Sequence, residues 1–158
     1  MLHNLWDGKR LFLLGTGTGL APFLSLIRYP ETYERYEGVV LVHGSRQVAE
    51  LAYGERIQRQ LPQDEFLGDM IRQEFVYYPT VTREPFRNRG RITDLMTSGQ
   101  LFADIGQSGL DPRHDRFMLC GSPQLLADLK TIFTEQGLRE GNHGEPGDYV
   151  IEKAFVEK

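Results

Sequence analysis

A glycine-rich stretch near the amino end is the clearest sign of a binding site in this chain. The stretch LFLLGTGTGLAPFLSLI, residues 11–27, holds three glycines and two threonines between two apolar runs. The run Leu11 to Leu14 predicts a buried strand, and apolar residues at helical spacing from Leu20 to Ile27, with Pro22 in the first turn, predict a helix. Unpaired backbone N–H groups and the helix dipole favour an anion at such a junction. We therefore predict that a phosphate group binds at Gly15, Thr16, Gly17, Thr18 and Gly19.

Arginines at the predicted strand ends indicate which nucleotide carries that phosphate. The apolar run GVVLVHG, residues 38–44, predicts a second buried strand, and Ser45 and Arg46 follow it directly. Sites for NAD usually place a carboxylate at this point, whereas a guanidinium fork suits a 2′-phosphate. Arg83 and Arg91 follow the third predicted strand, residues 74–81, and we expect them to reach the same crevice. The sequence predicts a preference for NADP(H) over NAD(H).

Each of these signals has a plainer alternative. The turn does not match G-x-G-x-x-G, since Leu20 stands in place of the third glycine, and it lacks the lysine of a P-loop. These motifs alone leave two other interpretations open. The glycine turn could be a tight turn without a ligand, and the arginines could belong to a basic loop that only keeps the surface solvated.

The predicted elements alternate between strands and helices. Beyond the three strands above, residues 116–121 and 149–155 are predicted to be strands. Helices are predicted over residues 47–61, where Gly54 weakens the middle, over 92–106 with a break near Ser98 and Gly99, and over 123–136 with Ser122 as N-cap. The predicted fold class is α/β, Rossmann-like and doubly wound, with a mainly five-stranded parallel sheet and helices on both faces. In such a sheet the ends of the strands open onto one crevice.

Composition excludes several classes of function. The chain has 158 residues, enough for one domain, and a net charge of −4 that argues against nucleic-acid binding. Its apolar runs are far shorter than the roughly 18–20 residues of a membrane span, so we expect no membrane partner. The single cysteine, Cys120, rules out an internal disulfide and a cysteine zinc cluster, and we expect no metal site. A reducing, cytoplasmic location is the default expectation.

Five blocks of sequence, in order, resemble a known family. They are GTGTGLAPFLSLIR, VHGSRQVAELAY, VTRE…GRITDLM, MLCGSPQLL and YVIEKAFVEK, and they resemble the NADP(H)-binding half of bacterial ferredoxin–NADP reductases. The resemblance implies an FAD-binding β-barrel domain as partner and electron transfer between NADPH and ferredoxin or flavodoxin. It implies that the glycine turn cradles the pyrophosphate and that Arg46, Arg83 and Arg91 contact the 2′-phosphate.

The resemblance also assigns residues around the nicotinamide and the flavin. It implies that Cys120 and Glu152 are the catalytic residues beside the nicotinamide. Gly121 and Ser122 would border the cofactor at the same strand end. Ala154 would lie against the flavin ring, and Phe155 would belong to a short tail packed around FAD.

The sequence departs from this family in one large respect. The flavin barrel is absent from the chain, so we expect residues 1–10 to be a remnant of an interdomain connection and residues 11–158 to form the NADP(H)-binding domain with a C-terminal flavin-facing tail. We expect the chain alone to be inactive, and Leu2, Leu5, Trp6 and Phe155 to form an exposed apolar patch. Two alternatives stay open: the NADPH-binding half of a flavin or oxygenase reductase, and a non-catalytic NADP(H)-binding module.

Overall fold

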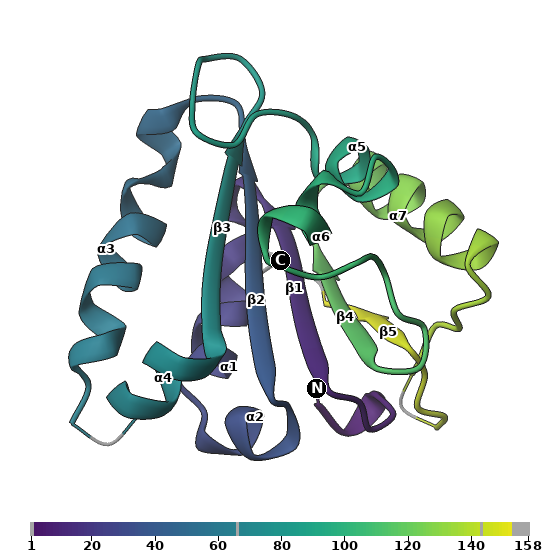
Figure 1. Cartoon of the computed structure of the whole chain (residues 1–158). Helices are drawn as coiled ribbons and strands as arrows, with labels where there is room; N and C mark the ends of the chain where they lie inside the picture. The colour runs from purple at the N-terminus through teal and green to yellow at the C-terminus, as the bar shows by residue number, and fades with distance from the viewer. Residues whose placement is uncertain (1, 66, 143, 153–158) are drawn as a thin grey trace, which may run out of the picture.

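A five-stranded parallel sheet forms the centre of the molecule (Figure 1). The computed structural model describes residues 2–65, 67–142 and 144–152. The strands are β1 (Arg10–Thr16), β2 (Gly38–Ser45), β3 (Phe75–Val81), β4 (Asp115–Cys120) and β5 (Tyr149–Ile151). Their order across the sheet is β3-β2-β1-β4-β5, which confirms the predicted doubly wound α/β fold.

The strand order reverses between β1 and β4. The chain adds β2 and β3 on one side of β1, and then returns to add β4 and β5 on the other. At the carboxyl end of β1, Gly15 lies in register with His43 of β2 and Cys120 of β4. In open parallel sheets the ligand crevice lies at such a reversal.

Helices cover both faces of the sheet (Figure 1). The α-helices are α1 (Ala21–Ile27), α2 (Pro30–Arg35), α3 (Ala52–Gln60), α4 (Gly68–Glu74), α5 (Ile92–Thr97), α6 (Gln100–Asp104) and α7 (Pro123–Glu135). Short 3₁₀ turns are η1 (Leu2–Asn4), η2 (Gly17–Leu20), η3 (Val48–Leu51) and η4 (Leu61–Gln63).

Alternation along the strands divides the core into two layers, because successive strand side chains point to opposite faces. Leu11 and Leu13 of β1 pack in the layer that holds residues of α1, α2 and α4. Phe12 and Leu14 pack in the other layer, with residues of α5, α6 and α7. All four side chains are fully buried, which explains the unbroken apolar run in the sequence.

Several local predictions from the sequence are confirmed. The predicted break in residues 92–106 separates α5 from α6, and Gly99 takes a left-handed φ of 84° there. Ser122 caps α7, with its Oγ accepting a hydrogen bond from the backbone N–H of Leu125 at 3.2 Å. Gly54 has a packing role beyond weakening the helix, because a Cβ at that position would lie 2.2 Å from the hydroxyl of Tyr77.

The predicted apolar patch at the amino end is wrong for two of its residues. Leu2 and Leu5 are buried in the core layer of α1 and α2, with 5% and 3% of their surface exposed. Arg35 holds this segment by donating to the carbonyl oxygens of Leu2 and Leu5, at 2.6 and 3.1 Å. Trp6 is exposed as expected, and Phe155 lies outside the described residues.

Candidate functional site

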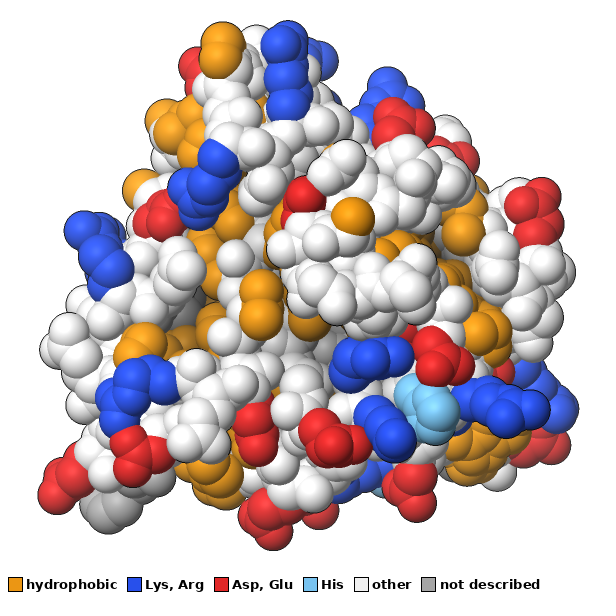
Figure 2. Space-filling model, viewed as in Figure 1, with side chains coloured by type: hydrophobic (Ala, Val, Ile, Leu, Met, Phe, Trp, Pro, Cys, Tyr) orange, Lys and Arg blue, Asp and Glu red, His pale blue; other side chains and the backbone are white. Residues whose placement is uncertain are grey.

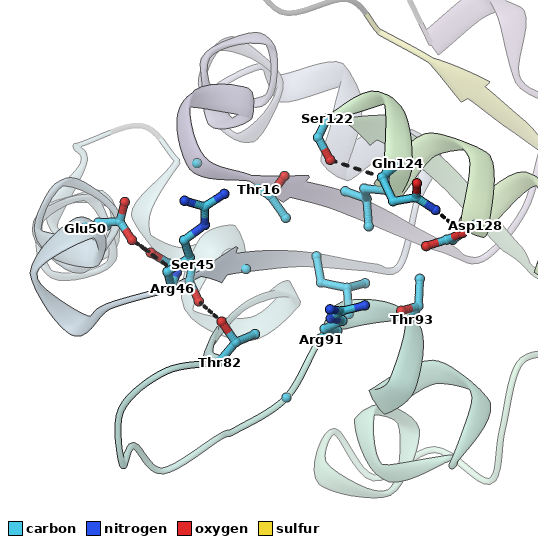
Figure 3. Close-up of a pocket in the computed structure, with 15 residues that line it drawn as sticks. Thr16, Ser45, Arg46, Glu50, Thr82, Arg91, Thr93, Ser122, Gln124 and Asp128 are labelled. Carbon is cyan, nitrogen blue, oxygen red and sulfur yellow. Dashed lines mark hydrogen bonds between the residues drawn. The ribbon is translucent and has the colours of Figure 1, made fainter.

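A cleft of about 440 Å³ opens at the carboxyl ends of the strands, beside the point where strand order reverses. The residues at the ends of β1, β2 and β4 all contribute to it, so the expectation that strand ends open onto one crevice is confirmed (Figure 3). The lining residues are Thr16, Gly17, Gly44, Ser45, Arg46, Glu50, Thr82, Gly90, Arg91, Ile92, Thr93, Ser122, Gln124, Leu125 and Asp128.

The glycine turn forms one wall of this cleft. Thr16 ends β1, and Gly17 starts η2 with a φ of 55°, a conformation that L side chains rarely adopt. A Cβ on Gly17 would meet no described atom within 4 Å, so the turn faces open space. The backbone of Thr18 and Gly19 continues the 3₁₀ turn, and α1 begins only afterwards. The predicted strand-to-helix junction is therefore present, with one turn of 3₁₀ helix inserted.

His43 lies beneath the glycine turn. Its ring is almost wholly buried, and Nδ1 is 3.1 Å from the hydroxyl of Tyr77. Burial lowers the pKa of His43, an effect only partly offset by the backbone of Gly17 and the carboxylate of Glu50. The neutral form of the imidazole is therefore favoured next to the turn, where His43 lies in register with Gly15.

Two of the three predicted arginines line the cleft. Arg46 extends from the end of β2, and Arg91 from the start of α5 (Figure 3). Neither guanidinium forms an ion pair within the part of the chain that the structure describes, whereas nearby Arg87 pairs with Glu55 at 3.3 Å. Arg83 is exposed and does not line the cleft, but its backbone N–H donates to the carbonyl oxygen of Arg46 at 3.0 Å.

The loop between β3 and α5 carries much of the positive charge at this end of the molecule. Figure 2 shows lysine or arginine side chains over this loop, at the top of the view. The four arginines of the loop are Arg83, Arg87, Arg89 and Arg91.

The end of β4 forms the opposite wall. Gly121 follows Cys120, and a Cβ on Gly121 would lie 2.6 Å from Oγ1 of Thr16 and 2.9 Å from Cδ2 of Leu125. Only glycine therefore lets β4 and α7 approach the end of β1 this closely. Ser122 lines the cleft, as predicted for a cofactor-binding residue.

Cys120 and Glu152 are brought together at the ends of neighbouring strands. Cys120 is fully buried in the layer of α1, and burial, followed by the nearby Glu152 charge, raises the pKa of its thiol. The backbone N–H of Glu152 donates to the carbonyl oxygen of Leu119 at 2.8 Å, just beyond β5. Ala154 and Phe155 lie outside the described residues.

Sequence reasoning missed most of the polar residues of the cleft. Glu50 has the clearest overlooked signal, because Gln47 and Glu50 have the spacing of a capping box at the start of η3. Thr82, Thr93, Gln124 and Asp128 carry no comparable motif. Thr82 reaches the cleft because it directly follows β3, and the other three reach it because the fold brings the start of α5 and the first turns of α7 to the strand ends.

Neither a metal-binding cluster nor a membrane-spanning helix is found among the described residues. No group of three or more His, Cys, Asp or Glu side chains among them is arranged to hold a metal ion. None of the helices within the described ranges is both long and apolar enough to cross a membrane.

Comparison with known sequences gives consistent matches. The model of the family described as oxidoreductase NAD-binding domain matches residues 13–131. A ferredoxin–NADP reductase of Pseudomonas aeruginosa is 57% identical over 160 residues, covering 100% of this chain and 62% of that protein. A ferredoxin–NADP reductase of Azotobacter vinelandii is 56% identical over 156 residues, covering 98% of this chain and 60% of that protein.

A solved structure has the same architecture over nearly the whole chain. It is a ferredoxin NADP⁺ reductase from Neisseria gonorrhoeae with bound FAD and NADP, 27% identical, with a TM-score of 0.83. The match covers 98% of this chain and 60% of that one. The chain thus spans about 60% of the length of each of these three proteins.

Proposed function

This chain belongs to the oxidoreductase NAD-binding domain family, and from that membership we propose that it is the NADP(H)-binding half of a ferredoxin–NADP reductase. The proposed activity is an oxidoreductase reaction between NADPH and FAD, which passes electrons to or from ferredoxin or flavodoxin. The Pseudomonas and Azotobacter relatives, each more than half identical to this chain, support this proposal.

The residues of the cleft suit a dinucleotide phosphate. The open space over Gly17 leaves room for an anionic group against the backbone of the turn. Arg46 and Arg91 place two guanidinium groups in the same cleft without an ion-pair partner among the described residues. Two guanidinium groups that form no ion pair with the residues described here, beside an open glycine turn, are the observation that carries the proposal.

Each predicted cofactor contact then has a distinct role. The turn Gly15–Gly19 binds the pyrophosphate, and Arg46 and Arg91 bind the 2′-phosphate through charge-assisted hydrogen bonds. Arg83 acts from the loop edge, where its backbone fixes the position of Arg46. Gly121 and Ser122 border the cofactor at the end of β4.

The proposed catalytic residues lie at the other end of the cofactor. When bound, the nicotinamide supplies a hydride for FAD, which an FAD-binding partner domain mainly holds. In this proposal the small, weakly polar thiol of Cys120 borders the ring. Glu152, whose charge lies near that thiol, supplies a carboxylate beside it. Ala154 and Phe155 complete the flavin-facing tail in this proposal. The protein acts chiefly by orienting the two rings and by excluding water. We place the protein in the cytoplasm.

The first test separates binding from catalysis. We expect this chain alone, mixed with NADPH and an artificial electron acceptor, to show no turnover above buffer, because no flavin accepts the hydride. The same chain joined to the FAD-binding domain of the Pseudomonas relative is expected to reduce the acceptor, as followed by NADPH absorbance.

Two outcomes of this test contradict the proposal. Turnover by the isolated chain without flavin would show that the reaction does not need the partner domain. Binding of NADPH with no turnover in the joined protein would favour the non-catalytic NADP(H)-binding module. Comparing oxidised flavodoxin with free FMN as acceptor of the joined protein distinguishes a flavodoxin partner from a flavin reductase.

A further inference from the structure

A carboxylate lies inside the loop that carries Arg46. Glu50 is the third residue of η3 and lines the same cleft as Arg46. A negative charge here is unexpected, since it repels a phosphate group at close range. The hydrogen bonds of Glu50 suggest why it is present.

One oxygen of Glu50 gathers three donors from the loop. Oε1 accepts a hydrogen bond from Oγ of Ser45 at 2.8 Å (Figure 3). It also accepts from the backbone N–H of Arg46 at 3.1 Å and from that of Gln47 at 3.0 Å. These bonds lower the pKa of Glu50, the Ser45 hydroxyl contributing most, so the carboxylate stays ionised at neutral pH. The residues that follow β2 are thus folded around a single acceptor atom.

The opposite side of the loop is held by the strand-end residues of β3. The carbonyl oxygens of Ser45 and Arg46 accept from the backbone N–H groups of Thr82 and Arg83, both at 3.0 Å. A second carboxylate, Glu84, accepts from the N–H of Val48 at 2.7 Å. The backbone of Arg46 is therefore fixed at both its N–H and its carbonyl, and only its side chain is left to adjust to a ligand.

We propose that Glu50 is a positioning residue that sets the preference for a 2′-phosphate by holding Arg46 in place. The inference rests on the proposed function. Glu50 accepts hydrogen bonds from Ser45 Oγ and from two backbone N–H groups, so these donors are not available to a phosphate. The Arg46 guanidinium is then the group of the loop that binds the anion. A loop ordered before binding loses less conformational entropy when the ligand arrives.

The positioning role and simple charge repulsion predict opposite results. If Glu50 acted only through its charge, its removal would strengthen phosphate binding. If Glu50 positions Arg46, Glu50→Ala weakens binding of 2′-phospho-AMP by about tenfold, because three loop donors lose their acceptor. Glu50→Gln keeps an oxygen for the same donors and is expected to stay within about threefold of the wild type.

Calorimetric titration of the whole chain with 2′-phospho-AMP and with 5′-AMP tests the inference. For Glu50→Ala we expect the affinity for 2′-phospho-AMP to fall as stated above, while the affinity for 5′-AMP changes by less than about twofold. Ser45→Ala, which removes one of the three donors, is expected to weaken 2′-phospho-AMP by about threefold. Glu55→Ala is the matched control, because it removes a carboxylate from neighbouring α3 without touching residues 45–47, and we expect no selective loss.

Three results overturn the inference. Unchanged or stronger 2′-phospho-AMP binding by Glu50→Ala, in a protein with wild-type circular dichroism, leaves the proposed function intact but removes the role of Glu50. A Glu50→Ala chain that fails to fold is replaced by Ser45→Ala, whose unchanged selectivity has the same meaning. Equal binding of the two nucleotides by the wild type contradicts the proposed function itself, and the inference falls with it.

Discussion

Arg46→Ala is expected to weaken binding of 2′-phospho-AMP by about 10- to 100-fold while leaving 5′-AMP within about twofold. The guanidinium lines the cleft, has no ion-pair partner among the described residues and extends from a loop fixed on both sides. A planar fork can donate two hydrogen bonds to a phosphate, and the mutation removes both together with the charge. Arg46→Lys keeps the charge alone and is expected to fall between the wild type and the alanine variant. Calorimetric titration measures all three proteins.

Arg87→Ala is the control for nonspecific loss of positive charge. Arg87 lies on the same basic loop as Arg91, but it pairs with Glu55 and does not line the cleft. We expect it to change the affinity for 2′-phospho-AMP by less than about threefold at moderate salt. An equal loss in Arg46→Ala and Arg87→Ala would mean that the basic loop attracts anions without a defined subsite.

Phe117→Ala is expected to lower the free energy of unfolding by about 3–5 kcal/mol. The Phe117 ring is fully buried in β4, with its centroid 5.1 Å from that of Phe12 and 4.7 Å from that of Phe133. The ring centroid of Phe133 lies 4.9 Å from that of Tyr149, so this row of aromatic rings joins β1, β4, α7 and β5. Its loss leaves a cavity beneath the strands that end at the cleft. Urea unfolding followed by circular dichroism measures the change.

Val76→Ala provides the matched control for the stability measurement. Val76 is also a strand residue, but 41% of its surface is exposed, so its truncation is expected to cost less than about 0.5 kcal/mol. A Phe117→Ala variant as stable as Val76→Ala would show that the aromatic rings do not hold together β1 and β4, the strands between which the strand order reverses.

The sequence was most informative where side chains are buried on both faces of a strand. The uninterrupted apolar residues of β1 and β2, and the cap and proline that begin α7, predict their elements because local pattern and tertiary burial agree. The common crevice could also be predicted from the sequence, since parallel strands place their carboxyl ends at one edge of the sheet. Most of the fold could be predicted from these features.

Two of the short helices, α2 and α4, were not predicted, because each has fewer than two turns and its apolar residues show too little periodicity. α2 has 6 residues and buries the side chains of Thr32 and Tyr33, whereas α4 has 7 residues and buries one side chain, that of Ile71, together with Gly68. Proline at the start of α2 and Arg35 in its last turn were available signals. The burial of Leu2 and Leu5 depends on hydrogen bonds from Arg35, about 30 positions further along, and no local pattern indicates such contacts.

The sequence indicated cleft residues at the ends of three strands. Thr16 is the last residue of β1, Gly17 and Arg46 directly follow β1 and β2, and Ser122 comes two residues after β4; all four line the cleft. Arg91 reaches it from the start of α5, while Arg83 contributes only its backbone to the Arg46 loop. The full part played by Glu50 required coordinates, because the capping-box spacing indicates only the bond from the N–H of Gln47, and the bonds from Ser45 and Arg46 depend on the loop geometry.

Titration of the wild-type chain with 2′-phospho-AMP and with 5′-AMP, in the same salt, tests the central claim most directly. The arginine-lined cleft predicts that 2′-phospho-AMP binds at least about tenfold more tightly, and that the difference narrows as ionic strength rises. Equal affinities, or no binding of either nucleotide, would contradict the assignment of Arg46 and Arg91 to a 2′-phosphate subsite.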